Sequence, residues 1–249
     1  MAKQKGMIPL VGTIGGINFY YLNGKPVARA AGGGFNGKAI KTKARMQRVR
    51  ENASEFGHCS KVNKAFRMAL RPFYAGHRFT FFHSRLMTLF TQLKTLDTVH
   101  ERGARRVATG VSAEAGKQML IDFNYTPKMD LSQVLPFSYR LDWTSYTLSF
   151  PSFAIDAVVF ISGATHMALQ FGILDFDFES LESELYLANA LVIDKHFSGT
   201  SLSFSPVSAP SGAGLYLAVF GLRYYQEVDG LLYALKAQNA LGFGVLGCR

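Results

Sequence analysis

The residues whose types and spacing are best suited to chemistry are the carboxylates of the segment Asp175-Phe176-Asp177-Phe178-Glu179. Side chains alternate between the two faces of an extended strand, so Asp175, Asp177 and Glu179 are predicted to share one face. Three carboxylates on one face could bind a hard cation such as Ca²⁺ or act as an acid/base pair. They could also form a solvated edge that discourages aggregation between sheets, or receive a basic segment of another copy of the chain.

Other patterns that would support catalysis or cofactor binding are not found in the sequence. The glycines of residues 12–16 have neither the spacing of a phosphate-binding loop nor that of a dinucleotide fingerprint, and we interpret them as a hinge. The six histidines show no HExxH spacing, and Cys59 and Cys248 show no CxxC spacing. We therefore predict that the protein is not an enzyme and has no catalytic residue, metal site or cofactor.

The net charge of +10 is distributed unevenly along the chain. Residues 1–110 contain 20 Lys and Arg against 4 Asp and Glu, whereas residues 111–249 contain 7 against 13, so the two parts carry +16 and −6. Arg45, Arg48 and Arg50 belong to the densest basic stretch. Such a split predicts either contact with nucleic-acid phosphates or complementary surfaces on copies of the same protein.

A β-hairpin is predicted near the N-terminus, because Asn23-Gly24 separates two runs of strand-forming residues. Asn-Gly favours the positive φ angles of a two-residue hairpin turn. Glycines precede the hairpin and follow it as Gly32-Gly33-Gly34. An isolated hairpin is marginally stable in water, so we expect it to dock through Phe19 and Tyr20, on its own chain or on a neighbouring subunit.

The elements that would position these residues change in type along the chain. Apolar residues three or four apart predict helical structure over residues 42–73, interrupted near 57–60 and stopped by Pro72, and a further helix over 79–96. Short β-rich runs follow, with a second hairpin turn at Asp229-Gly230. The predicted strands are 118–125, 137–141, 145–150, 156–161, 165–174, 185–193, 199–205, 214–226, 231–237 and 241–246.

These elements predict the α+β class, with an N-terminal β-hairpin arm and helices followed by a mainly antiparallel β-sandwich. The expected domains are a basic arm plus helical region over 1–110 and a sandwich over 111–249, with the boundary near 107–117. No apolar run is long enough to span a bilayer. The apolar run near the N-terminus is too short for the hydrophobic region of a signal peptide. This predicts cytoplasmic synthesis, after which the chain stays in the cytoplasm or leaves as part of a released particle.

Three stretches carry a family resemblance: MAKQKG followed by GTIGGINFY, then RVRENASEFG, and finally YYQEVDG followed by NAL. They resemble an uncharacterised family of proteins of similar length from Bacteroidota genomes, which likewise lack signal peptides. The likeness covers both ends of the chain, whereas the middle diverges and residues 30–37 are richer in glycine and less acidic than in that family. The family has no established activity, so the resemblance implies no site residues.

The favoured function is that of a structural subunit that self-assembles into a filament, tube or shell. In this hypothesis the hairpin docks on a neighbour, while Arg45, Arg48 and Arg50 face the acidic strand at residues 175–179 of that neighbour. The alternative is a non-specific nucleic-acid-binding protein that uses the basic N-terminal helix. A carbohydrate- or metal-binding sandwich that uses the acidic strand is a third hypothesis.

Overall fold

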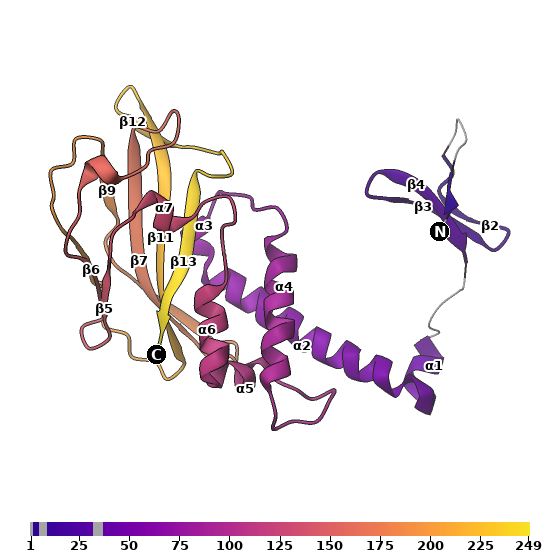
Figure 1. Ribbon diagram of the computed structural model, residues 1–249. Helices are drawn as coiled ribbons and strands as arrows, with labels where there is room; N and C mark the ends of the chain where they lie inside the picture. The colour runs from indigo at the N-terminus through magenta and orange to yellow at the C-terminus, as the bar shows by residue number, and fades with distance from the viewer. Residues whose placement is uncertain (1, 5–8, 32–36) are drawn as a thin grey trace. The chain divides into compact units, whose positions relative to one another are not determined.

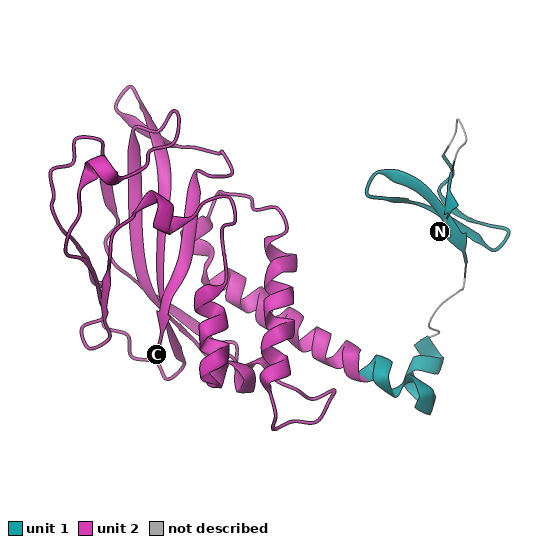
Figure 2. Cartoon of the chain, viewed as in Figure 1, with its two compact units in different colours: residues 1–50 teal, residues 51–249 magenta. Residues whose placement is uncertain are grey.

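The computed structural model describes residues 2–4, 9–31 and 37–249. The chain forms two compact units, residues 1–50 and residues 51–249 (Figure 2). Strands and helices in the N-terminal part are followed by antiparallel sheets, which confirms the α+β class. The glycines at positions 32–34, predicted to follow the hairpin, lie outside the described residues.

The first unit contains a small antiparallel sheet whose strand order is β1-β4-β3-β2. The strands are β1 (Ala2–Lys3), β2 (Gly12–Ile14), β3 (Ile17–Leu22) and β4 (Lys25–Ala30), and the short helices α1 (Gly37–Thr42) and η1 (Ala44–Met46) follow them. Asn23 and Gly24 have φ angles of 51° and 75°. These are the positive angles that a two-residue hairpin turn requires, so the predicted hairpin is confirmed.

The helical part of the second unit begins with α2 (Gln47–Ala69), whose first four residues precede the unit boundary and which is one continuous helix of 23 residues. The predicted interruption near residues 57–60 is therefore wrong, because Gly57 remains in the helical conformation. Pro72 lies in the short helix α3 (Arg71–Tyr74), and α4 (Phe82–Leu93) with η2 (Lys94–Leu96) confirms the next predicted helix. Three further helices are α5 (Val107–Ser112), α6 (Glu114–Asp122) and α7 (Leu131–Val134).

Two of the predicted strands are wrong. Residues 118–122 belong to α6, in which Gly116 and Leu120 are buried four residues apart, as one side of a helix requires. The run at residues 156–161 contains no strand, and its first two residues lie in the 3₁₀ turn η3 (Ile155–Ala157). Both runs combine apolar and β-branched residues. Over so short a length, the periodicity of such residues does not distinguish a helix from a strand.

The main sheet is built on two long central strands, β7 (His166–Phe176) and β11 (Leu215–Val228), shown in Figure 1. On one side, β8 (Ser183–Leu187) and β9 (Leu191–Asp194) pair with successive halves of β7. On the other side, β12 (Leu231–Ala234) and β13 (Leu241–Cys248) pair with successive parts of β11. Asp229 and Gly230 form the turn between β11 and β12 with φ angles of 52° and 77°, which confirms the second hairpin.

A smaller antiparallel sheet faces the main one and contains β5 (Arg140–Asp142), β6 (Thr147–Phe150) and β10 (Leu202–Phe204). The core between the sheets includes Phe171, Phe220 and Leu148. The opposite face of the main sheet packs on the helices, where the ring of Phe66 in α2 lies 5.3 Å from that of Phe176 in β7. The second unit therefore has three layers: helices, main sheet and small sheet.

The helices of residues 51–122 share a core with β7, β11 and β13. For this reason the two compact units separate between Arg50 and Glu51, whereas the sequence predicts a boundary near residues 107–117. A change of charge sign in the sequence does not mark the end of a core. Across the described ranges, no helix is long and apolar enough to cross a membrane.

Candidate assembly and binding surfaces

One face of the N-terminal sheet is apolar. Directly paired residues of antiparallel strands place their side chains on the same face, and the register pairs Ile17 with Ile14 and Ala30, Phe19 with Ala28, and Tyr21 with Pro26. Ile14, Ile17 and Tyr21 are 57%, 44% and 49% exposed. Within the described residues of the first unit, Val27 is the one hydrophobic side chain in the fully buried class. We define the apolar face as Ile14, Ile17, Phe19 and Tyr21. The first unit therefore has no hydrophobic core among its described residues that covers this face.

The opposite face of this sheet is mixed and basic. Tyr20 pairs with Val27, Asn18 pairs with Arg29, and the Arg29 guanidinium carbon lies 5.5 Å from the centre of the Tyr20 ring. Phe19 and Tyr20 are neighbours in one strand, so their side chains point to opposite faces. Of the two, only Phe19 belongs to the apolar face.

The three arginines singled out in the sequence have different surroundings. Arg50 is half-buried, and its Nη1 donates hydrogen bonds to the carbonyl oxygens of Ile40 at 2.6 Å and Lys43 at 3.1 Å. Arg45 and Arg48 are exposed. Arg50 thus joins the start of α2 to the preceding turn, and the three guanidinium groups do not form a single exposed basic face.

The three carboxylates of residues 175–179 also differ. Strand β7 ends at Phe176, so the expected alternation stops there. Phe176 and Phe178 both enter the core, and Asp177 and Glu179 are exposed. The Asp177 carboxylate accepts hydrogen bonds from the Glu179 amide at 2.7 Å and the Ser180 hydroxyl at 2.8 Å, and these bonds lower its pKa.

Asp175, in contrast, is only 8% exposed, and its Oδ1 has no hydrogen-bond partner among the described residues. It is paired with Glu184 across the strands, and a Cβ atom at Gly212 or Gly214 would overlap its carboxylate. Burial raises the pKa of Asp175, and the nearby charges of Glu184 and Asp177 raise it further, while the Gly214 amide partly opposes them. The three carboxylates therefore do not share one solvent-accessible surface.

We expect Asp175→Asn to stabilise the protein at neutral pH. A raised pKa means that the folded state binds the Asp175 proton more tightly than the unfolded state does, so ionisation lowers stability as the pH rises above the ordinary value of 3.8. The variant should be more stable than the wild type at pH 7 and lose this advantage below pH 3.8. Urea denaturation at several pH values measures the difference in unfolding free energy between the variant and the wild type. Destabilisation at pH 7 would instead show that the ionised carboxylate is needed.

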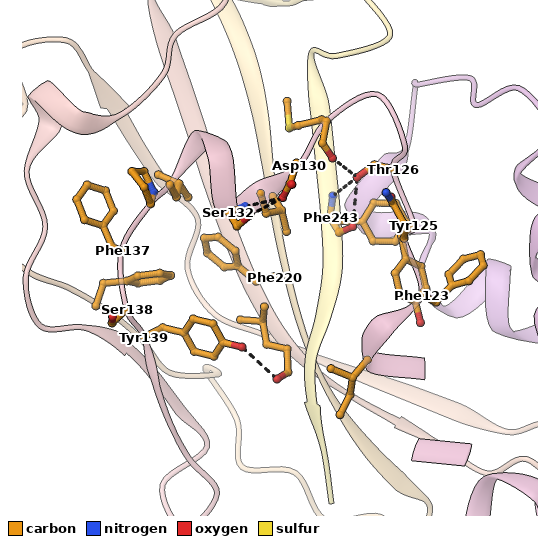
Figure 3. A pocket seen from close by; sticks show the side chains of 18 residues that line it. Phe123, Tyr125, Thr126, Asp130, Ser132, Phe137, Ser138, Tyr139, Phe220 and Phe243 are labelled. Atoms are coloured by element: carbon orange, nitrogen blue, oxygen red, sulfur yellow. Dashed lines mark hydrogen bonds between the residues drawn. The ribbon is translucent and has the colours of Figure 1, made fainter. Parts of the chain in front are cut away.

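The second unit contains a pocket of about 740 Å³ that follows the edge strand β13 (Figure 3). In this view Phe137, Tyr139 and Phe220 lie on one side of β13, and Phe123 and Tyr125 lie on the other. Among the described residues that line the pocket, Asp130 is the only charged one, and it caps α7 by accepting a hydrogen bond from the Ser132 amide at 2.9 Å. The lining therefore suits an apolar group.

The open edge of β13 contributes backbone groups beside this pocket. The Tyr224 amide donates to the Ala240 carbonyl oxygen at 2.9 Å, and the alternation of an antiparallel ladder then directs the amide and carbonyl of Phe243 away from β11. The Thr126 hydroxyl accepts a hydrogen bond from the Phe243 amide at 3.3 Å. The pocket brings residues 121–139 together with residues 220, 243 and 246, which are distant in the sequence. No local motif in the sequence could have indicated it.

Among the described residues, the side chains that most often bind metals or act as nucleophiles do not form a metal-binding or catalytic cluster. No group of three or more His, Cys, Asp and Glu residues in the described ranges could hold a metal ion. Cys59 and Cys248 are free thiols, and burial raises the pKa of both, that of Cys248 to about 12. A thiol with so high a pKa is a poor nucleophile, because the reactive form is the thiolate.

The boundary between the two compact units separates the charges more completely than the boundary predicted from the sequence does. Residues 1–50 contain 10 Lys and Arg and no Asp or Glu, and residues 51–249 contain 17 of each kind. The first unit therefore carries the whole net charge of +10. Its sheet is apolar on one face and carries Lys25 and Arg29 on the other.

No family model, no curated protein and no solved structure matches this chain. The resemblance to the Bacteroidota family therefore remains a prediction.

Proposed function

We propose that the protein is a structural subunit that self-assembles into a filament, tube or shell, with the N-terminal sheet of one copy docking on another. The apolar face of that sheet is the observation that carries this proposal. Burial of apolar surface is the main source of folding stability, and the first unit buries Val27 alone among its described hydrophobic residues. Docking on a second subunit would stabilise the arm and form the contact between subunits at the same time.

The charge distribution supports contact between unlike surfaces. Residues 1–50 carry +10, whereas residues 111–249 carry −6. An open array requires two different patches to meet, and we assign Arg45 and Arg48 to one patch and the exposed Asp177 and Glu179 to the other. Exposed ion pairs contribute only about 0–1 kcal/mol each. They would therefore set the register of the contact, while the apolar face would supply most of its free energy.

The double variant Ile17→Thr with Tyr21→Thr tests the proposal. Threonine preserves the preference for a strand, so the sheet should persist while its apolar face becomes polar. We expect the wild type to sediment as particles much larger than the 27.5 kDa chain and the variant to sediment as a single chain. Asn18→Thr, on the opposite face, is the matched control and should assemble normally. A wild-type protein that is a monomer at about 0.15 M salt would contradict self-assembly.

The absence of acidic residues from the first unit supports non-specific nucleic-acid binding as the second candidate function. Phosphate contacts release counterions, so binding should weaken steeply as salt is added. Under this alternative, gently purified protein would carry nucleic acid, and Arg45→Gln with Arg48→Gln would reduce the salt dependence of binding. Self-assembly that is unchanged by nuclease treatment would favour the first candidate.

A further inference from the structure

A second pocket of the larger unit, about 330 Å³ in volume, differs from the apolar one in its charge. Three loops form it: residues 77–81 before α4, residues 126–128 after α6, and Gln238 before β13. Its described lining contains Arg78, Arg85 and Lys128 and no carboxylate. Pockets of this size hold small molecules, and the excess of cations selects for an anion.

The positive charge of Arg85 is not neutralised by its neighbours. Its guanidinium donates to the carbonyl oxygens of Asn124 and Tyr125 and lies 5.0 Å from the centre of the Phe123 ring. These contacts fix the orientation of the group, but none of them is an anion. Arg78 and Lys128 are exposed at the same pocket, so their flexible side chains can close on a ligand.

An aromatic side chain stands beside these cations. Phe81 is 73% exposed and has a φ angle of 62°, a conformation that bulky side chains rarely adopt. It also lines an adjoining pocket of about 220 Å³ that contains Arg67 and His83. A large exposed ring between cationic pockets contributes little to the core, but it offers a flat surface on which another aromatic ring can stack.

A polar atom at the base of the pocket also lacks a partner. The Nε2 of His77 is buried and has no hydrogen bond among the described residues. Burial lowers the pKa of His77, and the neighbouring Arg223 charge lowers it further, so the ring is neutral at neutral pH. Buried polar atoms normally have a hydrogen-bond partner, and a polar group of a ligand could supply this one.

We propose that this pocket binds a phosphate attached to an aromatic ring, as in a nucleotide, with the phosphate held by Arg78 and Lys128 and the ring stacked on Phe81. The chemistry is shared by a free mononucleotide and by one nucleotide of a single strand. The site is separate from the basic N-terminal unit and does not depend on self-assembly.

Isothermal titration of the full-length protein with AMP, adenosine and inorganic phosphate tests the proposal. We expect AMP to bind at least about tenfold more tightly than either fragment, because only AMP engages both the cations and the ring. Titration with a short single-stranded oligonucleotide distinguishes the two possible ligands. If it binds more tightly than AMP, the natural ligand is a nucleic-acid strand; if it binds equally or more weakly, the natural ligand is the free nucleotide. Failure of AMP to bind at about millimolar concentration would overturn the proposal.

Variants separate binding from a structural role. Lys128→Gln should weaken AMP binding about tenfold, whereas Lys195→Gln should not, although Lys195 also lies near a ring, 5.7 Å from the centre of Phe160. Phe81→Asn should remove stacking without loss of stability, since Asn tolerates a positive φ better than Phe does. If Lys128→Gln and Phe81→Asn both bind AMP as tightly as the wild type does, the pocket is not the binding site.

Discussion

Glu55→Gln is expected to destabilise the protein by about 3–5 kcal/mol, because it leaves the buried Lys94 and the half-buried Arg105 without their anion. The Glu55 side chain is fully buried and pairs with Lys94, whose side chain is 10% exposed. Its Oε1 accepts hydrogen bonds from Arg105 Nε and the Gly103 amide, both at 2.8 Å, and Arg105 Nη2 reaches Oε2 at 3.0 Å. This one carboxylate joins α2 to η2 and to the loop that leads to α5. Urea denaturation at pH 7 measures the loss.

The pH dependence of stability gives this prediction a second readout. Hydrogen bonds from Arg105 lower the pKa of Glu55 from 4.5 to about 2, with help from Lys94 and the Gly103 amide and against the effect of burial. The ionised carboxylate therefore stabilises the fold fully above pH 4.5, and this contribution is lost as the pH falls through about 2. The difference between wild type and Glu55→Gln should shrink by about 3 kcal/mol over that interval. Glu101→Gln, at an exposed position, is the control and should change stability little.

Local chemistry made parts of the fold predictable. Asn23-Gly24 and Asp229-Gly230 specify their turns by backbone preference alone, and both hairpins form there. The long strands β7 and β11 were also predictable, since continuous apolar runs bounded by turn residues indicate strands buried on both faces. The segment that became α6 was not, because its apolar residues fit a helix and a strand equally well over so short a length.

The candidate sites were less predictable, because contacts between distant residues decide them. Asp175 looked like a member of an exposed acidic strand, but packing against the loop of Gly212 and Gly214 buries it. Glu55 looked like an acid on a basic helix, whereas its partners lie 39 to 50 residues further along the chain. Phe19 and Tyr20 face opposite ways because they are neighbours in β3, and side-chain alternation in the predicted hairpin strand would have indicated this from the sequence.

Gly110→Ala is expected to destabilise the protein by about 3 kcal/mol through backbone overlap. Gly110 lies in α5 and is buried. A Cβ atom at this position would overlap the carbonyl oxygen of Leu93, the last residue of α4, and lie 2.8 Å from its carbonyl carbon. The atoms that would have to move are backbone on both sides, so relaxation requires a shift of α5 against the end of α4.

Gly57→Ala is the matched control, because it is the same substitution in a helix where a Cβ atom meets nothing within 4 Å. Alanine is favoured over glycine within helices by about 1 kcal/mol, so Gly57→Ala should stabilise the protein. Helix propensity alone predicts stabilisation at both positions, whereas close packing predicts opposite signs. Urea denaturation midpoints of the two variants distinguish these possibilities, and stabilisation by Gly110→Ala would show that the close contact between α5 and the end of α4 does not control stability.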